Sequence, residues 1–281
     1  MLEGFDPDFD DCRWTDAWTR VPIIQVLPGV YETFSVKSWR MTEADVCGRR
    51  ITLSPPLEVR GLVTRDGTLW MSDVPQERLM MYNNAQASDG RVLVGGLGLG
   101  LYPQYALPRV ESLLIIERDD AIRRLVEPIV QVAAGAHRAS LDVRVGDVEE
   151  FLSGEGGPRY DTIFLDIWHT LDAASLPALN RLRDLAIRHL APGGRVLLWG
   201  YRWMVRLFEQ ACEQLLSMPP AEREDWLEAA TEGRPMARRL MRPVLARFSD
   251  LPGPEWESAL RWCREYVVTI RDDEAGAGEG R

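Results

Sequence analysis

RVLVGGLGLG, residues 91–100, is the stretch that decides the fold. Arg91–Val94 reads as a buried strand, and glycines follow it at alternate positions, Gly96, Gly98 and Gly100. Because glycine has no Cβ, it permits a tight turn and lets the backbone approach a ligand closely. The pattern predicts a ligand-binding loop at the carboxyl end of a strand. The alternative is a glycine-rich turn that serves only the packing of a strand against a helix.

Strands and helices alternate on the carboxyl side of this loop. Apolar runs predict strands at 112–117, 141–145, 160–166 and 195–199, the last preceded by a turn at 191–194. Helices are expected at 119–136, 148–152, 173–190 and 203–216. The alternation indicates βαβ crossovers, and the nearly continuous apolar strands indicate helices on both faces of the sheet. We therefore predict an α/β fold with a Rossmann-like, doubly wound and mainly parallel sheet.

Segments of different character flank this core. Residues 1–37 show no clear periodicity, whereas residues 50–75 contain short strand candidates at 51–53, 58–63 and 68–71. Arg65-Asp66-Gly67 supplies an Asp-Gly turn between the last two, which predicts a small N-terminal β-hairpin region. After the core, residues 220–264 read as a helical C-terminal extension, and Tyr266–Ile270 (YVVTI) reads as one more strand.

These differences divide the chain into four parts. A length of 281 residues accommodates one large domain with an appendage, or two modest domains. We expect an N-terminal segment with the hairpin at 1–88 and a Rossmann-like domain at 89–218. A helical extension with the last strand follows at 219–271, and a polar, glycine-rich, disordered tail at 272–281.

Bulk properties exclude several classes of protein. The formal net charge of −10 disfavours nucleic acid as a partner, because attraction to phosphate needs clustered basic residues. The acidic N-terminus does not resemble a signal peptide, and no apolar stretch approaches the ~20 residues that cross a bilayer. We therefore expect a soluble, cytoplasmic protein without a membrane partner.

The four cysteines, Cys12, Cys47, Cys212 and Cys263, form no C-x-x-C pair. A zinc ribbon and a dithiol redox motif are therefore unsupported, and we expect no metal site. In the reducing cytoplasm all four side chains should be free thiols.

Acidic residues end three successive strands after the glycine loop. Glu117 lies 19 residues after Gly98, near the distance at which dinucleotide-binding folds place a carboxylate on the ribose hydroxyls. Asp147 follows the third strand, where it could contact an adenine amino group, and Asp166 ends the fourth, facing the same crevice. For Glu117 and Asp147, capping of the following helix is the alternative role.

The spacing of the glycines separates ligand classes. A dinucleotide-binding loop reads G-x-G-x-x-G. Counted from Gly96, the third glycine comes one residue early, and counted from Gly98 the last position is Pro103, which disfavours an NAD-dependent oxidoreductase. A phosphate-binding P-loop is excluded because no Gly-Lys-Ser/Thr follows.

Taken together, these motifs resemble a class I S-adenosylmethionine (SAM)-dependent methyltransferase. More narrowly, the sequence resembles the spermidine-synthase-like branch, including small methyltransferase-like proteins of phages and actinobacteria. The resemblance covers about Gly67 to Gly200, roughly half of the chain. It rests on TLWMSDVPQER, RVLVGGLGLG, LLIIERDD, VRVGDVEEFL, YDTIFLDIWH and APGGRVLLWG.

The resemblance implies a seven-stranded sheet with SAM bound across the glycine loop. It implies that Glu117 holds the ribose, that Asp147 lies near the adenine, and that Asp166, with Ile167 and Trp168, lines the methyl-transfer site. The implied cofactor-binding residues are Gly95, Gly96, Leu97, Gly98, Gly100, Glu117, Arg118, Asp147, Val148 and Asp166. The hairpin resembles the small β domain of spermidine synthases, and the frequent association of relatives with this domain implies a homodimer.

Departures from the spermidine-synthase pattern disfavour aminopropyl transfer. Leu99 stands where those enzymes carry the acid of G-G-G-D-G, and His169 stands at the second acid of D-x-x-D, which acts on the amine. Their Tyr-Gln-Glu is absent, the nearest text being Pro75-Gln76-Glu77. The Asn/Asp-Pro-Pro-Tyr signature of amide methylation is also missing.

Asp166 and His169 are the catalytic candidates. His169 lies just past a strand, where an imidazole could act as a general base; a surface or helix-capping histidine is the alternative. Trp168 and Tyr201 are candidates for an aromatic substrate pocket, with core packing as the alternative. The sequence thus predicts a SAM-dependent methyltransferase whose acceptor, a small molecule or a protein, it does not reveal. A spermidine-synthase-like aminopropyltransferase and a non-catalytic SAM-fold scaffold are the alternatives.

Overall fold

The structure is a computed structural model that describes residues 3–154, 156–249 and 256–272. The chain forms two compact units, of which the first comprises Met1–His169 and Leu185–Trp199 and the second Thr170–Asp184 and Gly200–Arg281. The disordered tail predicted at 272–281 lies outside the described residues, except for Asp272. Among the described helices, none combines the length and the apolar composition that a bilayer span requires.

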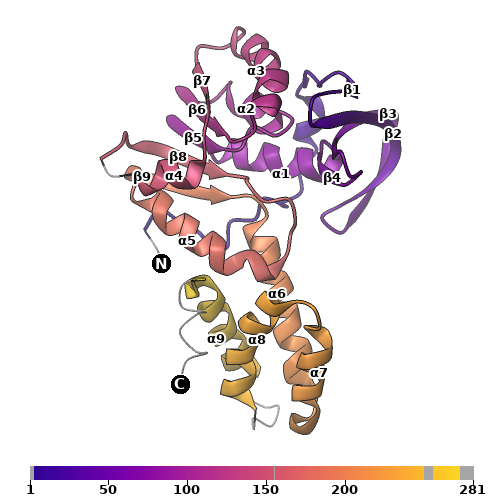
Figure 1. Ribbon diagram of the computed structural model, residues 1–281, viewed down its shortest axis with the longest axis vertical. Helices are drawn as coiled ribbons and strands as arrows, with labels where there is room; N and C mark the ends of the chain where they lie inside the picture. The colour runs from indigo at the N-terminus through magenta and orange to yellow at the C-terminus, as the bar shows by residue number, and fades with distance from the viewer. Residues whose placement is uncertain (1–2, 155, 250–255, 273–281) are drawn as a thin grey trace. The chain divides into compact units, whose positions relative to one another are not determined.

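A parallel sheet of five strands forms the centre of the first unit (Figure 1). In spatial order the strands are β7 (Ser140–Val145), β6 (Ser112–Glu117), β5 (Arg91–Gly95), β8 (Tyr160–Leu165) and β9 (Leu190–Leu198). All neighbouring pairs are parallel. The central strand residues Val92, Leu93 and Val94 are fully or almost fully buried, as expected for a strand covered on both faces. The predicted α/β, Rossmann-like fold is confirmed.

Two features of the sheet differ from expectation. The described residues supply five parallel strands, where the resemblance implied seven. The predicted turn at 191–194 lies inside β9, which pairs Leu190 with Tyr160 and then shifts register before Arg195 meets Thr162. The extra residues on β9 form an irregularity within a continuing strand, because pairing with β8 resumes on its far side.

Helices flank the parallel sheet. Within the first unit they are α1 (Pro75–Gln86), α2 (Leu101–Ala106), α3 (Asp120–Ala134) and α4 (Val148–Ser153), whereas most of α5 (Leu176–Ile187) belongs to the second unit. Helix α1 packs against α2, α2 against α3, and α3 against β6 and β7. In α3, Ile122, Val126 and Val130 are buried at a spacing of four residues, so an apolar stripe of this helix faces the core.

The order of the strands creates a crevice at the carboxyl ends of β5 and β8. The chain passes from β5 outward to β6 and β7 and then returns to the opposite side of β5 as β8. The connections that leave β5 and β8 therefore diverge. In open α/β sheets, ligands bind at such a topological switch point.

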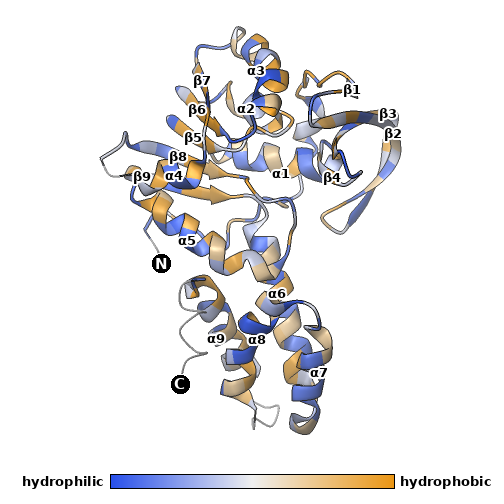
Figure 2. Cartoon of the chain, in the orientation of Figure 1, coloured by the Kyte–Doolittle hydropathy of each residue, from blue (hydrophilic) through white to orange (hydrophobic). Residues whose placement is uncertain are grey.

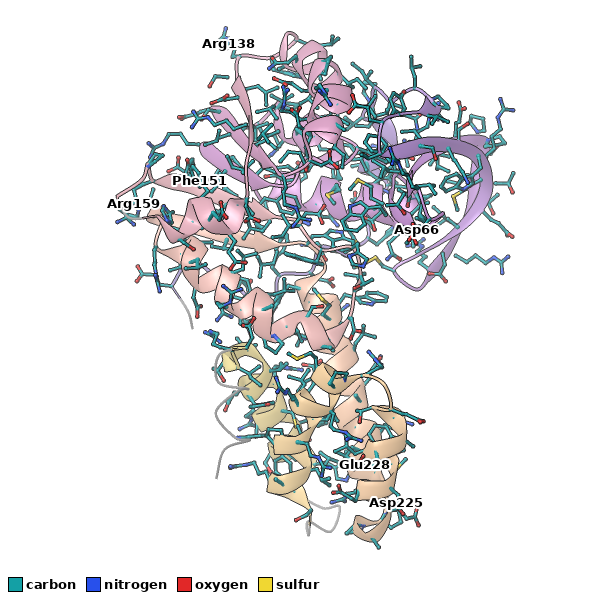
Figure 3. The ribbon with its side chains drawn as sticks, viewed as in Figure 1. Asp66, Arg138, Phe151, Arg159, Asp225 and Glu228 are labelled. Carbon is teal, nitrogen blue, oxygen red and sulfur yellow. A yellow bond between two sulfur atoms is a disulfide. The ribbon has the colours of Figure 1, made fainter. Side chains whose placement is uncertain are left out.

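An antiparallel sheet belongs to the same unit. Its strands lie in the order β1 (Gly29–Val30), β2 (Phe34–Val46), β3 (Arg49–Thr64) and β4 (Leu69–Ser72). The predicted Asp-Gly turn joins β3 to β4, with Asp66 in the turn (Figure 3) and Gly67 at a φ of 88°. The strands predicted at 51–53 and 58–63 are parts of the single strand β3. Strand β2 has no counterpart in the prediction, because most of its residues are exposed and its apolar pattern is weak.

A disulfide between Cys12 and Cys47 ties the N-terminal segment to the turn between β2 and β3. The prediction of four free thiols is therefore wrong. The fold brings together two cysteines separated by 35 residues, whereas Cys212 and Cys263 are free and buried. The same turn is held to α1, because the Cys47 N–H donates to Gln76 Oε1 at 3.2 Å.

The second unit is helical. Its longer helices are α6 (Tyr201–Ser217), α7 (Arg223–Ala230), α8 (Pro235–Phe248) and α9 (Trp256–Thr269), and hydrophobic and hydrophilic residues alternate along them (Figure 2). The strand predicted at 266–270 is wrong, since residues 266–269 complete α9 and Ile270 follows the helix. Ala259, Cys263 and Val267 are buried at a spacing of four residues, so helical packing overrides the β-branched composition of YVVTI.

The disulfide can be tested by counting thiols. In protein purified under air and denatured without reductant, we expect alkylation of two cysteines, and of all four after reduction, as measured by intact mass. Loss of the cross-link in Cys47→Ser should lower stability by roughly 2–4 kcal/mol, because the unfolded chain regains the freedom of a long loop. Alkylation of four cysteines without reductant would contradict the assignment.

Candidate functional site

A cavity of about 290 Å³ lies at the switch point, with all of its lining residues in the first unit. The glycine loop, the ends of β6 and β8, the turn after β7, strand β4 and helix α1 form its wall. The wall includes ten of the predicted site residues, Gly96, Leu97, Gly98, Glu117, Arg118, Asp147, Val148, Asp166, Trp168 and His169. Its volume is close to the lower end of the range of small-molecule sites, about 300–1,000 Å³.

The glycines that line the cavity occupy positions that a side chain would fill. Gly96 has a φ of 92°, and a Cβ there would lie 2.4 Å from the carbonyl oxygen of Asp166. Gly98 has a φ of 54°, and a Cβ there would lie 3.3 Å from Sδ of Met71. Both residues therefore need glycine for conformation and for space, and they leave backbone exposed to the cavity.

Gly95 and Gly100 serve packing instead. A Cβ at Gly95 would lie 2.8 Å from Cδ2 of Leu165, and one at Gly100 would lie 2.9 Å from Cγ1 of Val126. Neither glycine lines the cavity. Two glycines of the loop therefore pack against neighbouring side chains and two line the cavity, and ligand binding by the loop stays a prediction.

Glu117 is fixed at the end of β6 by two backbone hydrogen bonds. Its Oε2 accepts from the Leu97 N–H and its Oε1 from the Asp119 N–H, both at 2.8 Å. The cap of α3 is Asp119, whose side chain accepts from the first turn, so Glu117 is not the helix cap. A carboxylate has about four acceptor positions, and Glu117 can therefore accept further hydrogen bonds from a ligand.

Asp147 caps a helix and also lines the cavity, and its contact with an adenine stays a prediction. It is the N-cap of α4, with Oδ1 accepting from the N–H groups of Glu149 at 2.7 Å and Glu150 at 3.3 Å. It also lines the cavity beside Val148. The hydrogen bonds found among the described residues leave its second oxygen, Oδ2, for a ligand.

Asp166 follows β8 and faces the glycine loop. Its N–H donates to the carbonyl of Gly95 at 3.0 Å, so the two loops are held together across the switch point. Burial, and then the negative charges of Asp11 and Glu117, raise the pKa of the Asp166 carboxyl to about 7. A positively charged ligand group would favour its ionised form.

Aromatic rings surround the end of the cavity at β8 and β9. Trp70 and His169 stack at 4.8 Å between ring centres, and Trp168 lies 6.4 Å from Trp199. The imidazole of His169 is therefore part of the wall, and its role as a base stays a prediction. Tyr201 is not part of this wall; in the second unit its hydroxyl donates to Oδ1 of Asn180 at 2.6 Å.

The prediction omitted several cavity residues that come from the antiparallel sheet and the helix after it. Trp70 and Met71 lie on β4, and Glu77 and Met81 lie on α1. Two sequence signals pointed to this region. One was TLWMSDVPQER, which contains Trp70, Met71 and Glu77 and supported the resemblance without assigning them to the site. The other was the partial match at Pro75-Gln76-Glu77, which we interpreted as a departure from a motif.

No protein-family model matches the sequence, and no curated protein matches it. Solved structures do resemble parts of it. One, titled as an O-methyltransferase from Klebsiella pneumoniae, shares 24% identity over 38% of this chain and 47% of that one, with a TM-score of 0.31.

Two further structures show similar likeness. Precorrin 8w decarboxylase from Methanobacterium thermoautotrophicum shares 20% identity over 44% of this chain and 61% of that one, with a TM-score of 0.34. The N-methyltransferase NodS from Bradyrhizobium japonicum shares 17% identity over 50% of this chain and 84% of that one, with a TM-score of 0.35. The chain thus spans less than two thirds of the length of the first two.

Gly96→Ala tests the close approach of the two loops. A left-handed backbone alone costs a non-glycine residue about 1–2 kcal/mol. We expect Gly96→Ala to lower the free energy of unfolding by more than that, because the new Cβ would meet the Asp166 carbonyl. Gly193→Ala is the matched control, since Gly193 has a φ of 78° and nothing within 4 Å of an added Cβ. Equal losses for the two variants in thermal unfolding would contradict the packing argument.

Proposed function

We propose that this chain binds SAM in the cavity and transfers its methyl group to an acceptor. The observation that carries the proposal is the glycine loop at the switch point, with Glu117 fixed beside it by the Leu97 N–H. This arrangement combines an open backbone cradle with a carboxylate, which suits a ribose that carries two hydroxyl groups.

The residues around the cavity fit the parts of SAM. Glu117 would accept from the ribose hydroxyls, and Oδ2 of Asp147 from the adenine amino group. Ile116, Ile122 and Val148 provide apolar wall near Asp147 for a planar base. Asp166, across the switch point, would lie toward the positively charged part of the molecule.

Methyl transfer from SAM mainly requires the protein to hold the methyl donor and the acceptor in the right positions. When bound, SAM supplies a methyl group activated by a positively charged sulfur. Gly96 and Gly98 would bring the backbone close enough to orient it, and the Trp168 and Trp199 side chains would exclude water from the acceptor. Proximity and orientation of this kind account for a large part of the rate in displacement reactions.

Calorimetric titration with SAM, its demethylated product, decarboxylated SAM and NAD tests the proposal. We expect micromolar binding of SAM and its product, and much weaker binding of the other two. Glu117→Gln should weaken SAM binding by about 10- to 100-fold, because a hydrogen bond to a charged group contributes about 1.5–3 kcal/mol.

Glu111→Gln is the matched control, since Glu111 is exposed, immediately precedes β6 and does not line the cavity. Preference for decarboxylated SAM would favour an aminopropyltransferase. Absence of binding to all four compounds, in folded protein, would favour a scaffold and refute the proposal.

The pKa of Asp166 predicts how SAM affinity depends on pH. Below pH 7 the carboxyl is protonated and no longer attracts a cation, so affinity should be about tenfold lower at pH 6 than at pH 8. The stability of the ligand-free protein depends on pH in the opposite direction to its affinity for SAM. Its raised pKa means that the folded state holds the proton more tightly than the unfolded state, so Asp166 contributes less stability as pH rises from 4 to 7.

Asp166→Asn should bind SAM weakly at both values of pH and unfold at a higher temperature than the wild type at pH 8. Calorimetry and thermal unfolding at pH 6 and pH 8 measure the two effects. An affinity that does not change with pH in the wild-type protein would contradict the role assigned to this carboxyl.

A further inference from the structure

We infer that the methyl acceptor is an amine, whose nitrogen binds beside the Glu77 and Asp166 carboxyl groups and gives a proton to Glu77. The inference rests on the proposed function, since it assumes that SAM occupies the other end of the cavity. It assigns a role to Glu77, which the sequence analysis treated only as part of an incomplete motif.

The order of the strands gives the cavity two ends. Asp147 follows β7 and Glu117 ends β6, on one side of the glycine loop. Asp166 follows β8 and Trp199 follows β9, on the other side. With the adenosine placed at Asp147 and Glu117, the acceptor must enter at the end that contains Asp166, Trp199 and Glu77.

Glu77 lies on α1 and lines the same end of the cavity as Asp166 and Trp199. It lies in the first turn of the helix, immediately after β4 and its cavity residues Trp70 and Met71. The pKa of its carboxyl is raised well above the usual range by burial, and further by the charges of Asp166 and Asp11. A carboxylate with a raised pKa is a stronger base than usual and can accept a proton near neutral pH.

The carboxyl groups at the Asp166 end of the cavity favour binding of a positively charged ligand. Glu77 and Asp166 both line the cavity, and a third acid, Asp11, is buried close enough to act on both of them. Arg78, next to Glu77 on α1, is committed to Asp73, with 2.7 Å between Nη2 and Oδ2. The positive charge of SAM would offset one carboxylate, which leaves the second for a charged acceptor.

A buried indole supplies independent evidence of a ligand here. Trp199 is only 6% exposed and lines the cavity, and its N–H faces the Glu77 carboxyl. Among the described residues, this Nε1 has no hydrogen-bond partner of normal geometry. The Glu77 carboxyl is thus the acceptor nearest to this N–H, but the two do not form a full hydrogen bond, and a polar ligand atom beside them would complete the hydrogen bonding of the buried indole. The Trp168 and Trp199 rings also suit a cation, since the face of an indole attracts positive charge.

The reaction balances with these groups. An N–H bond of the ammonium breaks and its proton goes to the Glu77 carboxylate, which leaves a lone pair on nitrogen. That lone pair forms the new N–C bond to the methyl carbon while the C–S bond breaks and its electron pair returns to sulfur. The products are a methylated ammonium and the neutral thioether, and Glu77 then releases its proton to solvent.

The test compares amines with neutral molecules of the same shape. Full-length protein saturated with the demethylated cofactor is titrated with butylamine and benzylamine, and in parallel with butanol and benzyl alcohol. We expect the amines to bind at least tenfold more tightly than the alcohols. In the presence of methyl-labelled SAM, label should appear on the amines.

Variants separate this inference from the proposed function. Glu77→Gln should lower amine binding at least tenfold, while SAM binding changes less than about threefold. In methyl transfer it should reduce the acidic limb of the pH profile to the part that Asp166 contributes. Glu77→Asp keeps the charge and should restore part of the amine binding, and Glu111→Gln should match the wild type. Circular dichroism establishes that each variant is folded.

Two results would overturn the inference and leave SAM binding intact. One is an equal affinity for amines and alcohols in wild-type protein that binds SAM. The other is an unchanged amine affinity in Glu77→Gln. Failure of the wild-type protein to bind SAM or its demethylated product would instead remove the proposed function itself.

Discussion

The contact between the Gly96 backbone and the carbonyl of Asp166 is the constraint on which the cavity depends. The glycine loop leaves β5 on one side of the switch point and Asp166 leaves β8 on the other, and the two could separate without it. The Asp166 N–H donates to Gly95 at 3.0 Å, and Gly96 has no Cβ to hold the strands apart. The loop that would cradle a ligand and the acid that would face its charged part are therefore positioned by the same contact.

The four cavity carboxylates fall into two electrostatic classes. Glu117 and Asp147 each accept two backbone N–H groups, which fix the side chain. Asp166 and Glu77 are dominated by burial and by repulsion from neighbouring acids, which favour the neutral form and raise the pKa of each carboxyl. The first class suits permanent recognition of hydroxyl and amino groups, and the second suits groups whose charge changes when a cation arrives or a proton moves.

Most of the parallel sheet could be predicted because the inner strands β5, β6 and β8 are largely buried, so local apolar runs were sufficient. The run at 112–117 matches β6, and 160–166 differs from β8 by a single residue. The local sequence pattern gave wrong predictions where contacts between distant parts of the chain determine the structure. The first four residues of YVVTI complete α9 because Cys263 and Val267 pack on one face. The pairing of Cys12 with Cys47 depends on β2, a strand with only a weak apolar pattern. Glu77 and Trp70 were not assigned to the site for a similar reason: they lie within TLWMSDVPQER, but their place at the cavity follows from where β4 and α1 pack.

The N-terminal segment that contains Asp11 affects the electrostatics of the cavity at the end lined by Glu77 and Asp166. Asp11 is buried, accepts from Nδ2 of Asn84 on α1 at 3.2 Å, and raises the pKa of both Glu77 and Asp166. Its neighbour Cys12 is cross-linked to Cys47, so the disulfide and the Asn84 hydrogen bond hold Asp11 in place. The chemistry of the cavity thus depends on residues about 80 positions before the glycine loop, and a fragment that began at the loop would lack Glu77, its base, together with the charge that tunes it.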